Sequence, residues 1–378
     1  MKKILTAFYT TFCLFLCGFA QPGTIDPTFK TGTGTDNTVK GLALQPDGKI
    51  IVAGNFTTYI GTTCNRIARL NANGSLDADF NPGKGSEIAV GVITLQPDGK
   101  ILIGGGFTDI NGSASNHIAR LNADGSLDQT FNQCKGANNT VYAIALQPDK
   151  KIIAGGSFTS FNGSVSNHII RLNADGSTDN TFLTGTGTDN YVEDIALQPD
   201  GKIIVSGAFV NYNGIFSKHI TRLNTDGSRD TTFIIGKGAD GPVSEIVLQP
   251  DGKIIISGWF STYNSTECSA IARINTDGSP DKSFNTGAGS NLQIIALALQ
   301  PDGKIIIGGG FNRFNYTDCK HIGRLNADGS LDATFTGTGT DGFVNTLALQ
   351  PDGKIIIGGN FTTYNDTAHN RIARIQGK

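Results

Sequence analysis

The amino-acid sequence predicts an all-β protein, a seven-bladed β-propeller with four antiparallel strands in each blade. Three observations lead to this prediction. The phrase Leu-Gln-Pro-Asp-Gly-Lys recurs along the chain at a nearly constant interval. Each interval contains short β-branched runs separated by turn residues. One interval is divided between the two ends of the chain, as a closed ring of units requires.

Residues 1–20, the first element along the chain, resemble a secretory signal peptide. Lys2 and Lys3 give a positive start, and the next seventeen residues are mostly apolar or small. Gly18 and Ala20 lie where a signal peptidase prefers small side chains. Such a segment is short for a membrane span, although a membrane anchor is the alternative. We expect a signal peptide at residues 1–20, a propeller at residues 21–378, and a secreted, periplasmic or cell-surface protein with no membrane span in its mature form.

The repeated phrase occurs seven times, and lysine replaces its glycine in the third copy. Successive copies are 51 residues apart, except the last, which follows after 50. A fixed period of this size is typical of propellers and other repeat architectures. The copies begin at Leu44, Leu95, Leu146, Leu197, Leu248, Leu299 and Leu349.

The sixth unit illustrates the pattern that all units share. A Pro-Asp-Gly turn separates the first two apolar runs, a polar loop follows the second, and an Ala-Asp-Gly-Ser turn follows the third. Proline presets φ in such turns and glycine supplies a positive φ. The four expected strands of this unit span residues 294–300, 304–311, 321–326 and 331–335. Four strands without helical periodicity indicate one propeller blade.

The two ends of the chain share one unit. The last unit stops after its third strand, and its missing segment matches residues 23–29, which align with residues 329–335. We therefore expect the N-terminal strand to pair with the three C-terminal strands and to close the ring. Closure removes the unpaired edge strands that an open array would expose.

These motifs resemble the delta-60 repeat family of exported bacterial proteins. The resemblance is carried by the turn phrase, by Ile-Ile-Ile-Gly-Gly-x-Phe in the second strand, and by Leu-Asn-Ala-Asp-Gly-Ser-Leu-Asp-x-Thr-Phe after the third, and it covers residues 24–375. It implies a propeller-type fold and carries no established activity.

Several recurring residues are expected to be structural. The Asp-Gly turns resemble half of a calcium loop, but an arginine such as Arg120 stands where the first ligand would be, so we expect it to pair with a carboxylate within its blade. Recurring aromatic residues such as Tyr59 are expected to pack between blades. Cysteine spacing predicts no metal site, and Cys268–Cys319 is the one plausible disulfide, with free thiols as the alternative.

Residues that break the repeat mark the candidate ligand site. Glu193 and Asp194 begin the axial strand of the fourth unit, Glu245 begins that of the fifth, and Asp189 and Asp240 lie in the preceding loops. Clustered carboxylates of this kind can bind a polar ligand or raise one another's pKa. The alternative is solvated charge around a wet channel.

Two aromatic residues join this candidate site, on the face that carries the variable loops. Tyr142 of the third unit occupies the repeat position that Glu193 occupies in the fourth unit. Trp259 stands where the other units have small or amide residues, and it could stack on a ligand or fill a gap. Binding specificity is usually placed on loops held by a rigid scaffold.

The sequence favours a binding or adhesion module for a glycan or protein. The alternatives are a carbohydrate-active hydrolase or lyase using the carboxylates, and a passive envelope protein. The formal net charge of −2 argues against nucleic acid, which requires a basic face. The recurring histidines hold a blade position, and no catalytic residues, metal or cofactor are predicted.

Overall fold

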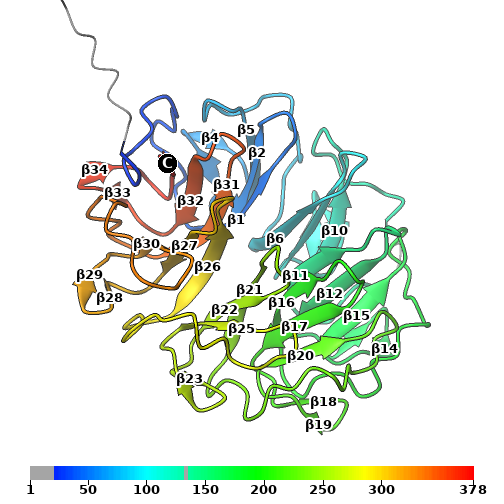
Figure 1. Cartoon of the computed structure of the whole chain (residues 1–378). Coiled ribbons are helices and arrows are strands. Elements are labelled where there is room, and N and C mark those ends of the chain that lie inside the picture. The colour runs from blue at the N-terminus through cyan, green and yellow to red at the C-terminus, as the bar shows by residue number, and fades with distance from the viewer. Residues whose placement is uncertain (1–20, 132–134) are drawn as a thin grey trace, which may run out of the picture.

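The structure is a computed structural model that describes residues 21–131 and 135–378. The regular secondary structure in these residues is all strand, and they contain no helix of the length and apolarity that a membrane crossing needs. The expected signal peptide and Cys134 lie outside the described residues. Seven similar units surround a central axis, so the chain forms a seven-bladed propeller (Figure 1).

Each blade contains one three-stranded antiparallel sheet. The first strands line the axis and are β1 (Val39–Leu44), β6 (Val90–Leu95), β11 (Val141–Leu146), β16 (Val192–Leu197), β21 (Val243–Leu248), β26 (Ile294–Leu299) and β31 (Val344–Leu349). The middle strands are β2 (Ile50–Gly54), β7 (Ile101–Gly105), β12 (Ile152–Gly156), β17 (Ile203–Gly207), β22 (Ile254–Gly258), β27 (Ile305–Gly309) and β32 (Ile355–Gly359). The third strands are β5 (Ile67–Leu70), β10 (Ile118–Leu121), β15 (Ile169–Leu172), β20 (Ile220–Leu223), β25 (Ile271–Ile274), β30 (Ile322–Leu325) and β35 (Ile372–Ile375).

In every blade, the loop between the middle and third strands contains a short hairpin whose two strands have two residues each. Its first strand carries the recurring aromatic residue in six blades and Ile110 in blade two. Tyr59 is fully buried in the core cluster that joins blades one and seven, and its hydroxyl donates to the Gly74 carbonyl oxygen at 2.6 Å. The expected packing role of this position is therefore confirmed. The hairpin strands are β3 (Thr58–Tyr59) and β4 (Thr62–Thr63), β8 (Asp109–Ile110) and β9 (Ser113–Ala114), β13 (Ser160–Phe161) and β14 (Ser164–Val165), β18 (Asn211–Tyr212) and β19 (Ile215–Phe216), β23 (Thr262–Tyr263) and β24 (Thr266–Glu267), β28 (Arg313–Phe314) and β29 (Thr317–Asp318), and β33 (Thr363–Tyr364) and β34 (Thr367–Ala368).

The expected fourth strand is reduced to a single bridged residue. In blade one, Leu76 forms a bridge with Leu70, and the chain then turns. The Asp77 carboxylate accepts a hydrogen bond from the Asp79 N–H at 3.2 Å, and the Phe80 N–H donates to the Asp77 carbonyl oxygen. Aspartate favours such local turns over a continued strand. Each blade therefore has three strands and one bridged segment, which corrects the expected four strands.

The hydrophobic core lies between blades. Each core cluster joins residues of two neighbouring blades, and one of them packs Val39 of blade one against Ile356 and Ile372 of blade seven. The middle strands are buried throughout, which explains their continuous β-branched runs.

One ion-pair arrangement recurs in all seven blades. In blade three, Arg171 and Lys151 both contact the same oxygen of Asp179, at 2.7 and 2.9 Å, and the guanidinium carbon lies 4.5 Å from the Phe182 ring centre. Burial opposes ionisation of Asp179, but hydrogen bonds from Thr181, Lys151 and Arg171 outweigh it and hold its pKa well below the usual value. The expected pairing of arginine with a carboxylate inside each blade is confirmed.

The same arginines also link neighbouring blades. The second nitrogen of each guanidinium donates to a carbonyl oxygen in the next blade at 2.5–2.6 Å. The pairs are Arg69 with Ala123, Arg120 with Ala174, Arg171 with Thr225, Arg222 with Thr276, Arg273 with Ala327, Arg324 with Gly377, and Arg374 with Ala72. The seventh bond returns to blade one, so this set of bonds forms a circle.

The N-terminal segment completes blade seven, as expected. Ile25 forms an antiparallel bridge with Ile375, and the Asp26 N–H donates to the Arg374 carbonyl oxygen at 2.8 Å. The Asp26 carboxylate accepts from the Arg374 Nε at 2.7 Å, as the equivalent aspartates do in other blades. Figure 1 shows the N-terminal segment beside the C-terminal strands.

Cys268 and Cys319 are not bridged; both are free thiols. Cys268 is buried in the core of blade five, whereas the Cys319 thiol donates to the Ile322 carbonyl oxygen within blade six at 3.1 Å. Burial raises the pKa of each thiol to about 12, so both are poor nucleophiles.

Replacing Asp26 with alanine tests ring closure. The change leaves the buried Arg374 guanidinium without its carboxylate, and removing one partner of a buried ion pair costs about 3–5 kcal/mol. We expect this loss in the free energy of unfolding, measured by urea denaturation. Asp179→Ala, the matched change in an internal blade, is expected to cost the same.

Asp318→Ala is the exposed control for this experiment. Asp318 pairs with Arg313 at 3.2 Å on the surface of blade six, so its loss is expected to cost less than about 1 kcal/mol. An effect of Asp26→Ala as small as that of the control would show that the N-terminal segment does not hold the ring closed.

Candidate functional site

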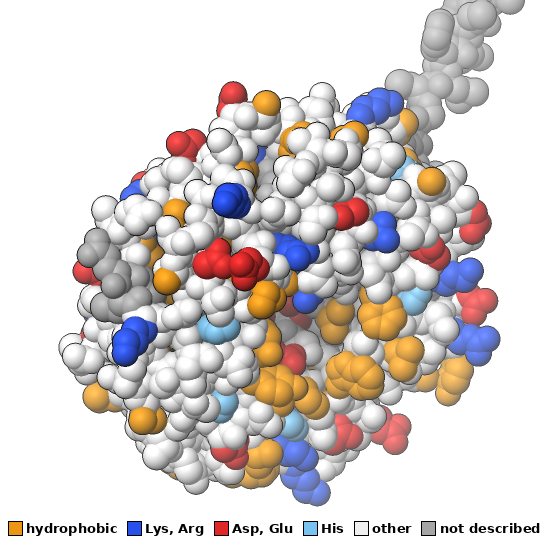
Figure 2. All heavy atoms as spheres, turned by 180° about the vertical axis from the view of Figure 1, so that it is seen from behind, with side chains coloured by type: hydrophobic (Ala, Val, Ile, Leu, Met, Phe, Trp, Pro, Cys, Tyr) orange, Lys and Arg blue, Asp and Glu red, His pale blue; other side chains and the backbone are white. Residues whose placement is uncertain are grey.

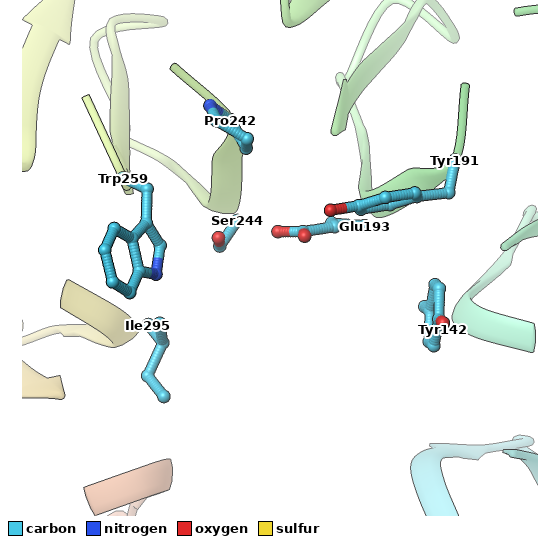
Figure 3. Close-up of a pocket in the computed structure, with 7 residues that line it drawn as sticks. All are labelled: Tyr142, Tyr191, Glu193, Pro242, Ser244, Trp259 and Ile295. Atoms are coloured by element: carbon cyan, nitrogen blue, oxygen red, sulfur yellow. The ribbon is translucent and has the colours of Figure 1, made fainter. Parts of the chain in front are cut away.

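A cleft with aromatic walls opens beside the central channel, over blades three to six. Its volume is about 740 Å³. We call it the aromatic cleft, and its lining residues are Tyr142, Tyr191, Glu193, Pro242, Ser244, Trp259 and Ile295. Figure 3 shows Tyr142 and Tyr191 on one side, Trp259 and Ile295 on the other, and Glu193 between them, pointing toward Ser244.

A β-bulge places the central side chains of the aromatic cleft. In blade four, Val192 pairs with Gly207 and Asp194 pairs with Ser206, so Glu193 is the extra residue. Such a bulge disrupts the ladder locally and redirects the side chain of the extra residue. The same bulge occurs in every blade, and it brings Tyr142, Ser244 and Ile295 to equivalent positions on neighbouring blades.

The aromatic side chains of the cleft are packed or anchored at one end and open to solvent at the other. The rings of Tyr142 and Tyr191 pack edge to face, with their centres 6.0 Å apart and an interplanar angle of 74°. Trp259 is 58% exposed, although its backbone N–H is fixed by a 2.9 Å hydrogen bond to the Pro242 carbonyl oxygen. The indole is thus held at its base while its ring remains available for contact.

Three carboxyl groups gather at the mouth of the channel, and we call Glu193, Asp194 and Glu245 the acidic trio. Burial raises the pKa of Glu193, and a hydrogen bond with Ser244 opposes the rise. Burial also raises the pKa of Asp194 to about 6, and Glu193 adds to this rise. Asp194 accepts hydrogen bonds from the Ile195 N–H at 2.7 Å and the Ile246 N–H at 2.8 Å, which favour its charged form.

Glu245 is the member of the acidic trio that is hardest to ionise. Burial and the neighbouring charges of Asp194 and Glu193 raise its pKa well above the usual value. Because Asp194 has two backbone donors, we assign the charge preferentially to Asp194 and the proton to Glu245.

Below the aromatic cleft, a channel of about 320 Å³ runs between the seven first strands. All members of the acidic trio line it, and Lys40 is the one basic side chain among its lining residues. Figure 2 shows hydrophobic side chains gathered around a hollow with acidic side chains inside it. Within residues 21–131 and 135–378, no group of three or more histidine, cysteine or acidic side chains is placed to hold a metal ion.

The structure brings together five of the seven residues that the sequence predicted for the site. Tyr142, Glu193 and Trp259 line the aromatic cleft, and Asp194 and Glu245 lie just below it in the channel. Asp189 and Asp240 line neither cavity.

Asp189 and Asp240 brace their own loops. The Asp189 carboxylate accepts from the Val210 N–H at 2.8 Å and the Asn211 N–H at 3.0 Å, and Asp240 does the same for Ser261 and Thr262. The repeat itself contains the signal for this role, because this position, eight residues before the repeated leucine, is aspartate or asparagine in six of the seven units. Asp189 and Asp240 share the negative charge of the acidic trio, but this charge does not place them in the candidate site.

Tyr191, Pro242, Ser244 and Ile295 were not predicted as site residues. Ser244 and Ile295 share the repeat position of Tyr142 and Glu193, four residues before the leucine of the turn phrase. A comparison of the residues at this position in neighbouring units indicates Ser244 and Ile295 as well. Tyr191 and Pro242 lie two residues earlier and share a second repeat position.

A family model described as "Domain of unknown function (DUF5122) beta-propeller" matches seven segments of the chain. The matched segments are residues 45–80, 96–131, 147–182, 198–233, 249–284, 300–335 and 350–376. The seven propeller repeats are thereby confirmed, whereas the delta-60 name stays a resemblance. No curated protein matches the sequence.

Solved propeller structures resemble the whole chain. The WD40 β-propeller domain of Doa1 is 14% identical, with a TM-score of 0.56 over 95% of this chain and 96% of that one. The extracellular domain of BT4673 from B. thetaiotaomicron, assigned as a hybrid two component system, is 14% identical, with a TM-score of 0.57 over 95% of this chain and 43% of that one. Catalytically inactive virginiamycin B lyase from Staphylococcus aureus, with quinupristin, is 18% identical, with a TM-score of 0.52 over 92% of this chain and 97% of that one. At these identities the likeness shows the fold alone.

Replacing Glu245 with glutamine tests the electrostatics of the acidic trio. Because folding raises the pKa of Glu245, its ionisation opposes folding, and this penalty grows as the pH rises from its unfolded pKa through its folded pKa. We expect Glu245→Gln to stabilise the protein at pH 8 by more than the roughly 0.5 kcal/mol that surface substitutions reach. The gain should vanish at pH 4, as measured by urea denaturation at both values.

Glu267→Gln is the matched control, because Glu267 is exposed on the β24 hairpin of the same blade. Its effect is expected to stay within about 0.5 kcal/mol at both pH values. A destabilising effect of Glu245→Gln at pH 8 would contradict the assignment of the proton to Glu245.

Proposed function

Because the chain belongs to the DUF5122 beta-propeller family, whose model matches all seven blades, we propose that it is an exported binding module that engages a glycan or a protein through the aromatic cleft. One observation carries this proposal. Exposed aromatic side chains converge over a carboxylate at the positions where the repeat is broken.

The pattern of variation supports a binding role. The residues that hold the blades together are nearly identical in every unit, but the bulge position differs in each, from Lys40 through Tyr142 and Glu193 to Asn345. Packing between blades therefore does not dictate this side chain. A pocket of several hundred Å³ with aromatic walls and a few polar groups is the usual form of a ligand site.

An extracellular setting supports the proposal as well. Residues 1–20 have the pattern of a signal peptide. A domain of similar fold stands in the extracellular part of BT4673.

A hydrolase or lyase is the second candidate, and the acidic trio favours it. A carboxyl group with a pKa near 6, such as Asp194, is poised for acid–base work near neutral pH. A passive envelope protein is the third possibility, for which the aromatic cleft would have no ligand.

One experiment separates these functions. Glycan and peptide libraries are screened for binding to, and cleavage by, the wild-type protein, Trp259→Ala and Glu193→Gln. We expect wild-type binding without cleavage, and at least tenfold weaker binding by both variants. Phe216→Ala, which removes another exposed aromatic side chain on the β19 hairpin of blade four, is the control and should bind normally.

The other outcomes each favour another function. Cleavage by the wild-type protein that Glu193→Gln loses would support the enzyme. Binding that is equal in all variants would place the ligand elsewhere, and an absence of binding and cleavage would leave the passive envelope role.

A further inference from the structure

The aromatic cleft offers π faces to a ligand from two sides. Trp259 is 58% exposed and Tyr142 is 43% exposed, so much of each ring is accessible to a ligand. Tyr191 packs edge to face on Tyr142 and completes that wall. The face of an aromatic ring carries partial negative charge and attracts cations, with tryptophan the strongest.

The charges around the aromatic cleft have one predominant sign. Its lining residues contain Glu193 and no lysine, arginine or histidine. Asp194 and Glu245 add acidic groups in the adjoining channel, and Lys40 on blade one is the single basic residue among the lining residues of the two cavities. Such a surface repels anions and concentrates cations.

Two buried hydroxyl groups beside the acidic trio lack hydrogen-bond partners. Ser206 and Ser257 are fully buried, and neither side-chain oxygen is paired within the described part of the chain. Ser206 is opposite Asp194 and Ser257 is opposite Glu245 in the strand register. The other blades have glycine or alanine at this position, so a carboxyl group faces a hydroxyl group only in blades four and five.

From this geometry we propose that the aromatic cleft binds an alkylammonium group, with Trp259 contacting the cation and Glu193 supplying its counter-charge. This inference rests on the proposed binding function and narrows its ligand class. A neutral sugar could stack on the same rings, but it would leave the acidic trio without a compensating positive charge.

A bound cation would also change the protonation of the acidic trio. The ionisable groups that line these two cavities are Glu193 and Asp194 on β16, Glu245 on β21, the tyrosines Tyr142 and Tyr191, and Lys40 on blade one. A cation favours ionised carboxyl groups, so protons compete with it. Affinity for an ammonium ligand therefore rises with pH, whereas the affinity for a neutral sugar does not follow this trend.

The test is calorimetric titration of the protein with four small probes. The probes are tetramethylammonium, Nα-acetyl-lysine amide, glucosamine and glucose, of which glucose is the uncharged match for glucosamine. We expect at least one ammonium probe to bind, and glucose to bind at least tenfold more weakly than glucosamine. Preference for the lysine derivative would point to a peptide source, and preference for glucosamine to an amino sugar.

Binding by three variants, and binding by the wild-type protein at two pH values, show whether the ammonium probe occupies the aromatic cleft. We expect Trp259→Ala and Glu193→Gln each to weaken binding of the ammonium probe at least tenfold, and Glu267→Gln, which removes an exposed charge outside the cleft, to leave it unchanged. For the wild-type protein, lowering the pH from 8 to 5 should weaken the binding of tetramethylammonium, whose charge does not change with pH, about tenfold, as expected for one competing proton on a group with a pKa of about 6, the value of Asp194. Thermal unfolding of each variant confirms that it is folded.

Two results would overturn the inference. Equal binding of glucose and glucosamine, abolished by Trp259→Ala, would show an uncharged ligand class while leaving the binding function intact. No binding of any ammonium probe would reject the ammonium ligand, and the library screen with Trp259→Ala would then decide the binding function separately.

Discussion

The structure depends on one buried arginine in each blade. Its Nε contacts the aspartate that begins the turn of its own blade at 2.5–2.8 Å, and a terminal nitrogen donates to a carbonyl oxygen of the next blade. Burying such an ion pair is costly, and the attraction offsets this cost only when the remaining donors and acceptors are satisfied. Here a lysine, a threonine or serine hydroxyl in most blades, and a phenylalanine ring complete the arrangement. The guanidinium thereby sets both the end of each blade and its spacing from the next.

Because these arginine contacts hold the blades together, the side chain at the start of each axial strand is free to vary. The bulge makes one residue per blade unpaired, and neither the ladder nor the core constrains its side chain. Seven such positions surround the channel mouth, and blades three to six use theirs for Tyr142, Glu193, Ser244 and Ile295. The acidic trio opposes folding, because its pKa values are raised rather than lowered. Residues that reduce stability without improving packing are typical of functional sites.

The sequence predicted most of the fold and part of the site. Ring closure, blade number and the arginine–aspartate pairs followed from the repeat, because each unit must make the same contacts as its neighbours. The predicted fourth strand was wrong, because the Asp77 carboxylate accepts from the Asp79 N–H and the Asp77 carbonyl oxygen accepts from the Phe80 N–H, which turns the chain after one bridged residue. Asp189 and Asp240 were assigned to the site from charge alone, although their carboxylates are occupied by backbone donors.

By itself, the sequence determined the class of fold, the number of blades and the shared blade, and it predicted the approximate location of the candidate site. All of these depend on local patterns that repeat seven times, and such patterns specify strands, turns and their order. Only the tertiary structure decided which side chains meet. Tyr191 and Trp259 are 68 residues apart in the chain and come from different blades, yet they face one cavity. Their meeting depends on the packing of blades four and five side by side in the ring, which the sequence pattern of a single unit does not specify.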